Sequence, residues 1–123
     1  MPYAYRKSER LRKNRDFSAV MQQGKRSSVD GLSLFYRKNG ADDFRVGISV
    51  SKKLANAVKR NRLRRQLRSC ISKVLGDRAA GYDMVFVARQ GLTGLAFDQI
   101  LGVVTQVLRR SPILDQRVEG SRQ

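Results

Sequence analysis

Residues 44–76, "FRVGISVSKKLANAVKRNRLRRQLRSCISKVLG", join a strand pattern to a helix pattern and decide the fold. Over 44–51, apolar residues alternate with Arg, Gly and Ser, which is typical of a half-buried strand. Asn56 is a suitable N-cap and Gly76 a suitable stop for a helix over 57–75. The apolar stripe of this helix consists of Leu63, Leu67, Cys70, Ile71 and Val74. This stripe must therefore face the sheet.

The flanking sequence predicts the remaining elements. These are a short helix within 14–24, strands over 26–29, 32–38 and 82–91, and a helix over 95–110. The first two strands are separated by a break at Asp30-Gly31. The order α-β-β-β-α-β-α predicts an α+β fold, a two-layer α-β sandwich of one sheet and helices.

The length of 123 residues accommodates one domain with a single core. We expect this domain over 14–110, preceded by a flexible basic arm over 1–13 and followed by a flexible tail over 111–123. Hydrophobic residues make up 41% of the chain, which is enough for it to fold.

The net charge of +16 indicates a polyanionic partner, because self-repulsion destabilises an isolated protein of this charge. Nucleic acid is the commonest such partner. An anionic membrane surface is the weaker alternative, since the sequence contains no long apolar span, signal-peptide pattern or lipidation motif. A single cysteine fits a reducing, cytoplasmic setting.

The composition argues against catalysis by the protein itself. The chain has no histidine and one cysteine, which disfavours Ser-His or Cys-His nucleophiles and a zinc site. Cys70 lies within the apolar stripe, so we interpret it as a small buried hydrophobe rather than a reactive thiol. Only Asp42 and Asp43 are adjacent among ten acids, which disfavours a protein-only nuclease with two-metal chemistry. We therefore expect no catalytic residue and no metal site.

The stretch 59–68 contains six basic residues and no acidic one. Lys59, Arg60 and Arg62 occupy the first helical turns, where the macrodipole and free N–H groups favour anions. We expect Arg60 to project past the helix start near Lys52 and Lys53. Arg60 and Arg62 are about 200° apart on the wheel, an arrangement that would straddle a backbone. The helix is thus predicted to bind phosphates, with an ordinary solvated basic face as the alternative.

These residues resemble a known family. The segment "RVGISVSKKLANAVKRNRLRRQLR", 45–68, is similar to the signature of the bacterial ribonuclease P protein component, and Arg60-Asn61-Arg62 matches its RNR motif. The stretch "LRKNRDFSAVMQQG", 11–24, resembles the family's first helix, and "DMVFVAR", 83–89, its last strand. The resemblance covers about residues 9–110.

The resemblance implies a four-stranded sheet with a left-handed β-α-β crossover, a hand that general rules of topology would not predict. It also implies a protein subunit of an endoribonuclease that removes 5′ leaders from precursor tRNA. Catalysis is carried by a large RNA subunit with magnesium, which that RNA mainly holds. The implied partners are the ribonuclease P RNA and precursor tRNA, in the cytoplasm.

The resemblance also implies two sets of site residues. Those expected to bind the RNA subunit are Lys52, Lys53, Arg60, Asn61, Arg62, Arg65 and Arg68. Those expected in a leader-binding cleft between the first helix and the sheet are Phe17, Met21, Ser33 and Phe35. Met21 departs from the aromatic residue common in the family, and Ser33 from a larger apolar one.

The residues themselves support a platform for single-stranded RNA, because such RNA is commonly held by aromatic rings flanked by cations. Plain core packing is the alternative for Phe17. Of Phe35 and Tyr36, strand alternation allows only one to face the cleft. A structural ribosomal or general nucleic-acid-binding protein remains the rival on charge alone, and the long match over 45–68 separates the two.

Overall fold

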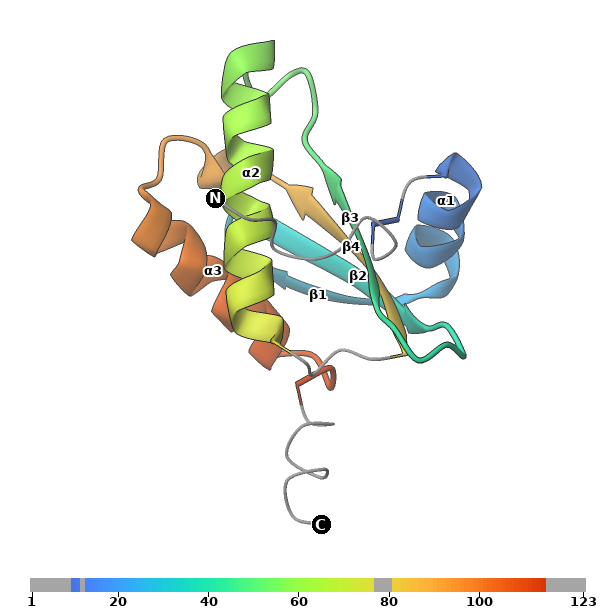
Figure 1. Cartoon of the computed structure of the whole chain (residues 1–123). Helices are drawn as coiled ribbons and strands as arrows, with labels where there is room; N and C mark the ends of the chain where they lie inside the picture. The colour runs from blue at the N-terminus through green and yellow to red at the C-terminus, as the bar shows by residue number, and fades with distance from the viewer. Residues whose placement is uncertain (1–9, 12, 77–80, 115–123) are drawn as a thin grey trace.

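The computed structural model describes residues 10, 11, 13–76 and 81–114 (Figure 1). The elements are α1 (Asn14–Gln23), β1 (Lys25–Val29), β2 (Leu32–Lys38), β3 (Arg45–Ser49), α2 (Ala57–Leu75), β4 (Tyr82–Ala88), the 3-10 helix η2 (Gln90–Leu92) and α3 (Phe97–Arg109). The predicted order α-β-β-β-α-β-α is confirmed, with the short η2 as an addition.

The four strands form one mixed sheet in the order β1-β2-β4-β3. β2 pairs antiparallel with both β1 and β4, whereas β3 and β4 are parallel neighbours. Parallel neighbours cannot be joined by a tight hairpin, so the chain crosses between them through α2. This crossover places the basic helix against one face of the sheet (Figure 1).

The two faces of the sheet are covered differently because side chains alternate along each strand. Phe86 belongs to the main core with residues of α2 and α3. Val85 belongs to a second, smaller cluster with Val20 of α1 and Leu11. The sandwich of sheet, α2 and α3 therefore carries α1 as a partial layer on its opposite face, which the sequence did not predict (Figure 1).

Helix α2 begins and ends where the sequence predicted. The Asn56 Oδ1 atom accepts a hydrogen bond from the Lys59 backbone nitrogen at 2.9 Å. Gly76 follows the helix with a φ of 53°, a left-handed value that glycine adopts at little cost. The buried residues of the helix are Leu63, Leu67, Cys70, Ile71 and Leu75, while Val74 is half-buried. Each such aliphatic side chain stabilises the fold by about 1.5–3 kcal/mol, so the apolar stripe anchors the basic helix on the sheet.

The packed domain extends beyond 14–110 at both ends. The Leu11 nitrogen donates to the Val46 oxygen at 2.8 Å, and the Leu11 side chain is only 4% exposed. Ile113 is fully buried and Ser111 nearly so, because the chain turns back onto the core after α3. The rest of the expected arm and tail, 1–9, 12 and 115–123, lies outside the described residues.

Within the described residues, none of the helices combines the length and apolar character that crossing a membrane requires.

Candidate nucleic-acid interface

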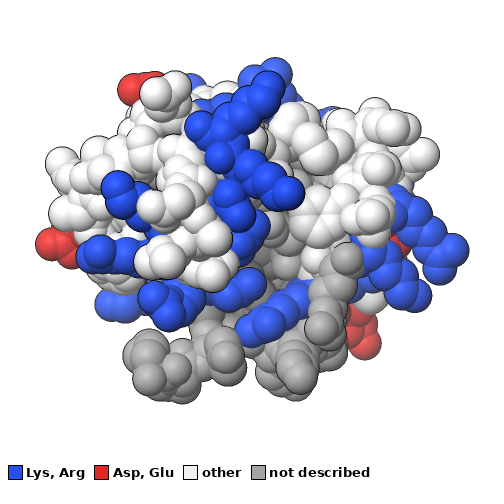
Figure 2. Space-filling model, turned by 90° about the horizontal axis from the view of Figure 1, so that it is seen from above, with Lys and Arg blue, Asp and Glu red and all other residues white. Residues whose placement is uncertain are grey.

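Helix α2 presents an almost purely basic outer surface. Its first turn contains no acidic residue, and Lys59, Arg62 and Arg65 are exposed. Lys52 and Lys53 are exposed in the turn that precedes it. Seen from the N-terminal end of α2, Lys and Arg side chains form a band across the molecule, with acidic side chains only at the periphery (Figure 2). The band is suited to a polyanion that lies across this end of the protein.

Arg60 occupies a different environment from its exposed neighbours. Its Nη1 atom donates to the Ala55 carbonyl oxygen at 3.2 Å, so the side chain folds back over the loop before α2. Its Nε atom is buried and has no hydrogen-bond partner. An unpaired buried donor is costly, and a phosphate oxygen is a suitable acceptor for it.

Two further arginines, Arg64 and Arg68, lie half-buried on the side of α2 that faces β3. Arg64 donates to the Asn61 Oδ1 atom at 3.1 Å, which fixes the side chain of Asn61. The family resemblance implies Arg68 as a site residue but does not include Arg64. The wheel position of Arg64, four residues before Arg68 on the same flank, is the signal that could have found it.

Phe17 lines two adjoining hollows between α1, β3 and α2. One, of about 160 Å³, also contains Gly47, Arg64 and Arg68 in its lining. The other, of about 560 Å³, is bordered by Phe17, Arg64 and polar side chains of α1. The ring of Phe17 is half-buried. One part of it packs against the smaller hydrophobic cluster of Leu11, Val20 and Val85, and the other part borders the two hollows, which together form the groove beside Phe17.

Phe35 also faces α1, whereas Tyr36 is buried in the main core, as strand alternation requires. The Arg26 guanidinium carbon lies 5.7 Å from the centroid of the Phe35 ring, within cation–π range. Met21, on the same helix as Phe17, is 40% exposed. Phe35 and Met21 are accessible to a ligand, but neither lines the two hollows beside Phe17.

Ser33 is only 2% exposed and belongs to a polar network on the α1 face of the sheet. Its Oγ atom lies 3.1 Å from the Ser28 Oγ atom and accepts from the Arg89 Nε atom at 3.4 Å. Ser28 in turn accepts from the Arg26 Nε atom at 2.9 Å. A hydroxyl held in this way offers no stacking surface, so Ser33 can contribute only polar contacts.

An ion-pair network fixes β3 relative to α1. Arg45 donates to both carboxylate oxygens of buried Asp83, at 2.9 and 2.6 Å, and lies 3.7 Å from Asp16 of α1. The hydrogen bond that Arg45 donates to Asp83 is the main cause that raises the pKa of Arg45 above its ordinary value. Asn39 donates to the same Asp83 oxygen that accepts from the Arg45 Nε atom, at 2.9 Å. These contacts join β3 to β4 and to α1, and α1 and β3 both border the groove beside Phe17.

Cys70 is fully buried on the side of α2 that faces the main core. Burial raises the pKa of its thiol to about 11, so the reactive thiolate is nearly absent at neutral pH. The interpretation of Cys70 as a core residue is confirmed.

Comparisons with known proteins agree on one family. The family model described as Ribonuclease P matches residues 5–111. The ribonuclease P protein component of Brevibacillus brevis is 37% identical over 111 residues, which cover 89% of this chain and 88% of the relative. That of Streptococcus pyogenes is 33% identical over 94% of this chain and 96% of the relative.

Solved structures give the same answer. The RNase P protein of Staphylococcus aureus superimposes with a TM-score of 0.81 at 33% identity, over 88% of this chain and 99% of that one. The RNase P protein of Thermotoga maritima superimposes with a TM-score of 0.76 at 32% identity, over 84% of this chain and 97% of that one. From its fold, its family-model match and these relatives, the chain belongs to the bacterial ribonuclease P protein family.

Proposed function

We propose that this chain binds the catalytic RNA of ribonuclease P and the 5′ leader of precursor tRNA. In this proposal it aids RNA-catalysed endonucleolytic removal of the leader, which gives the mature tRNA 5′ end. Lys52, Lys53 and the RNR motif contact the RNA subunit together with Arg65 and Arg68. The leader lies on the α1 face of the sheet, beside Phe17, Met21, Ser33 and Phe35.

The observation that carries the proposal is the unpaired charge of α2. Lys59, Arg62, Arg65 and Arg68 form no side-chain hydrogen bond or ion pair with the described part of the chain. Packing of the apolar stripe forces these cations to one surface, at a cost in mutual repulsion. Phosphates of a folded RNA relieve that repulsion and release counterions, which favours binding.

The groove beside Phe17 supports a separate role in holding a single strand. Phe17 and Phe35 expose part of their rings, and Arg26, Arg64 and Arg68 lie close to them. Aromatic faces stack bases of any sequence while cations hold the backbone, as a leader of variable sequence requires. The position of the groove next to α2 lets one protein contact both RNAs.

Magnesium ions in this proposal are held mainly by the RNA partner and supply the Lewis-acid chemistry of phosphodiester hydrolysis. The protein's own contribution is positive charge that substitutes for part of the ion atmosphere. Among the described residues there is no cluster of three His, Cys, Asp or Glu side chains that could hold a metal ion. The reaction is expected in the cytoplasm.

The test is a cleavage assay with precursor tRNA at low magnesium. The rigorously RNA-free protein, the RNA component and the reconstituted complex are compared. We expect cleavage by the complex at magnesium concentrations at which the RNA alone is nearly inactive, and none by the protein. Cleavage by RNA-free protein, or no acceleration of the RNA, would overturn the proposed function.

A further inference from the structure

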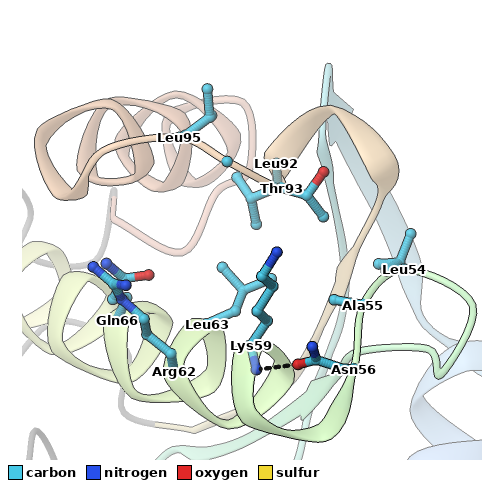
Figure 3. A pocket seen from close by; sticks show the side chains of 11 residues that line it. Leu54, Ala55, Asn56, Lys59, Arg62, Leu63, Gln66, Leu92, Thr93 and Leu95 are labelled. Atoms are coloured by element: carbon cyan, nitrogen blue, oxygen red, sulfur yellow. Dashed lines mark hydrogen bonds between the residues drawn. The ribbon is translucent and has the colours of Figure 1, made fainter.

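A pocket of about 510 Å³ lies beside the first turns of α2, on the opposite side of the helix from Arg64 and Arg68. It is enclosed by α2, the loop that precedes α2, and residues 92–95, which run from the last residue of η2 toward α3. Lys59 extends from α2 toward Thr93 on the opposite wall, with Leu63 beside it (Figure 3). The volume is in the range of sites that bind small molecules.

The lining combines an apolar floor with a basic and polar rim. Four leucines line it, namely Leu54, Leu63, Leu92 and Leu95. Lys59, Arg62 and Gln66 supply polar groups, and no lining residue is acidic. Such a pocket is complementary to a ligand that has an apolar body and a negative charge.

The polar groups of the rim are not engaged by the protein. Lys59, Arg62 and Gln66 form no side-chain hydrogen bond or ion pair with the described part of the chain. The Oδ1 atom of Asn56 caps α2, which leaves its amide nitrogen free to donate. In contrast, the Thr93 hydroxyl is occupied, since it donates to the Gln90 oxygen at 2.8 Å. Several donors of one pocket are thus available for a ligand at the same time.

We propose that this pocket accommodates one unpaired ribonucleotide. Its phosphate lies against Lys59 and Arg62, its base packs on Leu63 and Leu95, and the Gln66 amide contacts the base edge. An apolar floor distinguishes this site from one for phosphate alone. Proteins that recognise RNA commonly bind such splayed-out bases in pockets.

The inference rests on the proposed function, because an RNA must supply the nucleotide. Two sources share this chemistry, an unpaired position of the RNA subunit and an unpaired position of precursor tRNA. The pocket is separate from the groove beside Phe17, since the two lie on opposite flanks of α2 and share no lining residue.

The first test titrates the full chain with the four ribonucleoside 5′-monophosphates and, separately, with inorganic phosphate. NMR signals of the leucine methyl groups report on the apolar floor. We expect at least one monophosphate to shift the Leu63 and Leu95 methyl signals, whereas phosphate shifts only backbone amides near Lys59 and Arg62. If no monophosphate moves these methyl signals more than phosphate does, the pocket does not bind nucleotides. This result is independent of ribonuclease P activity.

The second test fills the pocket in the complex with RNA. We expect Gln66→Trp to weaken binding to the RNA that supplies the nucleotide by about tenfold, the size expected for one inserted base. Gln106→Trp, the same change at an exposed position of α3, should have no effect. Equal affinities of the two folded variants for both the RNA subunit and precursor tRNA would overturn the inference and leave the proposed function intact.

A crosslinking experiment identifies the source of the nucleotide and does not depend on the tryptophan variant. Because Cys70 is buried, a photoreactive reagent can be attached selectively to Thr93→Cys. We expect crosslinks from labelled Thr93→Cys to a single unpaired nucleotide of either the RNA subunit or precursor tRNA. Labelled Gly102→Cys, at an exposed position of α3, should give no crosslink. Crosslinks that fall only in paired regions, or equally from both positions, would contradict the proposal.

Discussion

The ring of Phe17 lies directly over Gly47 of β3, where a Cβ atom would be 2.5 Å from the Phe17 Cζ atom. Gly47 thus provides the space that lets α1 approach the sheet and position Phe17 at the edge of the groove. Arg45, Gly47 and Ser49 lie on the same face of β3, and only Gly47 has no side chain. The contact with Phe17 explains why this strand carries a glycine at that position.

Gly47→Ala should displace the Phe17 ring, because the new methyl group would occupy the same space. We expect a loss of about 1–3 kcal/mol in the free energy of unfolding and weaker binding of precursor tRNA. Gly102→Ala is the matched control, since nothing lies within 4 Å of its Cβ position in α3. That change should stabilise the protein by about 0.5–1 kcal/mol. Thermal melts of both variants measure stability, and a binding assay measures their affinity for precursor tRNA. If Gly47→Ala changes neither quantity, the Phe17 ring does not need the space that Gly47 leaves.

Phe17→Ala should selectively weaken binding of precursor tRNA and spare mature tRNA. Only the precursor carries leader nucleotides, and each stacked base contributes roughly 1–3 kcal/mol. Affinities of the reconstituted complex for both tRNAs are the measurement. Phe17→Leu, which keeps apolar volume but loses the ring face, separates stacking from packing, and a melting curve accompanies each variant. If both folded variants bind the two tRNAs with equally reduced affinity, Phe17 does not contact the leader.

Arg60→Ala and Arg62→Ala should weaken binding to the RNA subunit more than Arg109→Ala does. Arg60 and Arg62 lie at the start of α2, whereas Arg109 lies in the last turn of α3, where a cation is favourable to the helix itself. Each lost phosphate contact should reduce the magnitude of the salt slope by roughly 1. Binding across a salt series measures this. Similar losses at all three positions would indicate diffuse attraction rather than a defined interface.

Cys70 should make the protein less stable in alkaline solution. Its pKa is raised from 9.0 to about 11 in the folded state, so the unfolded chain loses this proton first as the pH rises. The contribution of the Cys70 thiol to the free energy of unfolding is fully present below pH 9. It declines between pH 9 and about pH 11, by roughly 1.4 kcal/mol per pH unit. Denaturant unfolding of the wild type and of Cys70→Ala at pH 8, 9 and 10 measures this contribution. The difference between the two proteins removes the effect of the other titrating groups, which both share. Parallel stability curves for the two proteins would mean that the thiol is not desolvated.

The local elements and the chemistry of the surface can be predicted from the amino-acid sequence alone. The bounds of α2 follow from Asn56, Gly76 and the apolar spacing between them, because capping and periodicity are properties of neighbouring residues. The helical wheel of α2 also predicts that most of its cations lie outside the apolar stripe and that Cys70 is buried within it. These features need no knowledge of what the helix packs against.

Contacts between side chains that are distant in the sequence depend on the complete fold. The sequence did not predict that α1 covers the opposite face of the sheet, or that Ile113 returns to the core. Nor did it predict that Phe17 rests on Gly47, thirty residues away. The pocket beside Lys59 is formed by two segments, 54–66 and 92–95, that are far apart along the chain. Such contacts depend on the order β1-β2-β4-β3, which results from the free energy of packing the whole sheet and its helices rather than from any local preference.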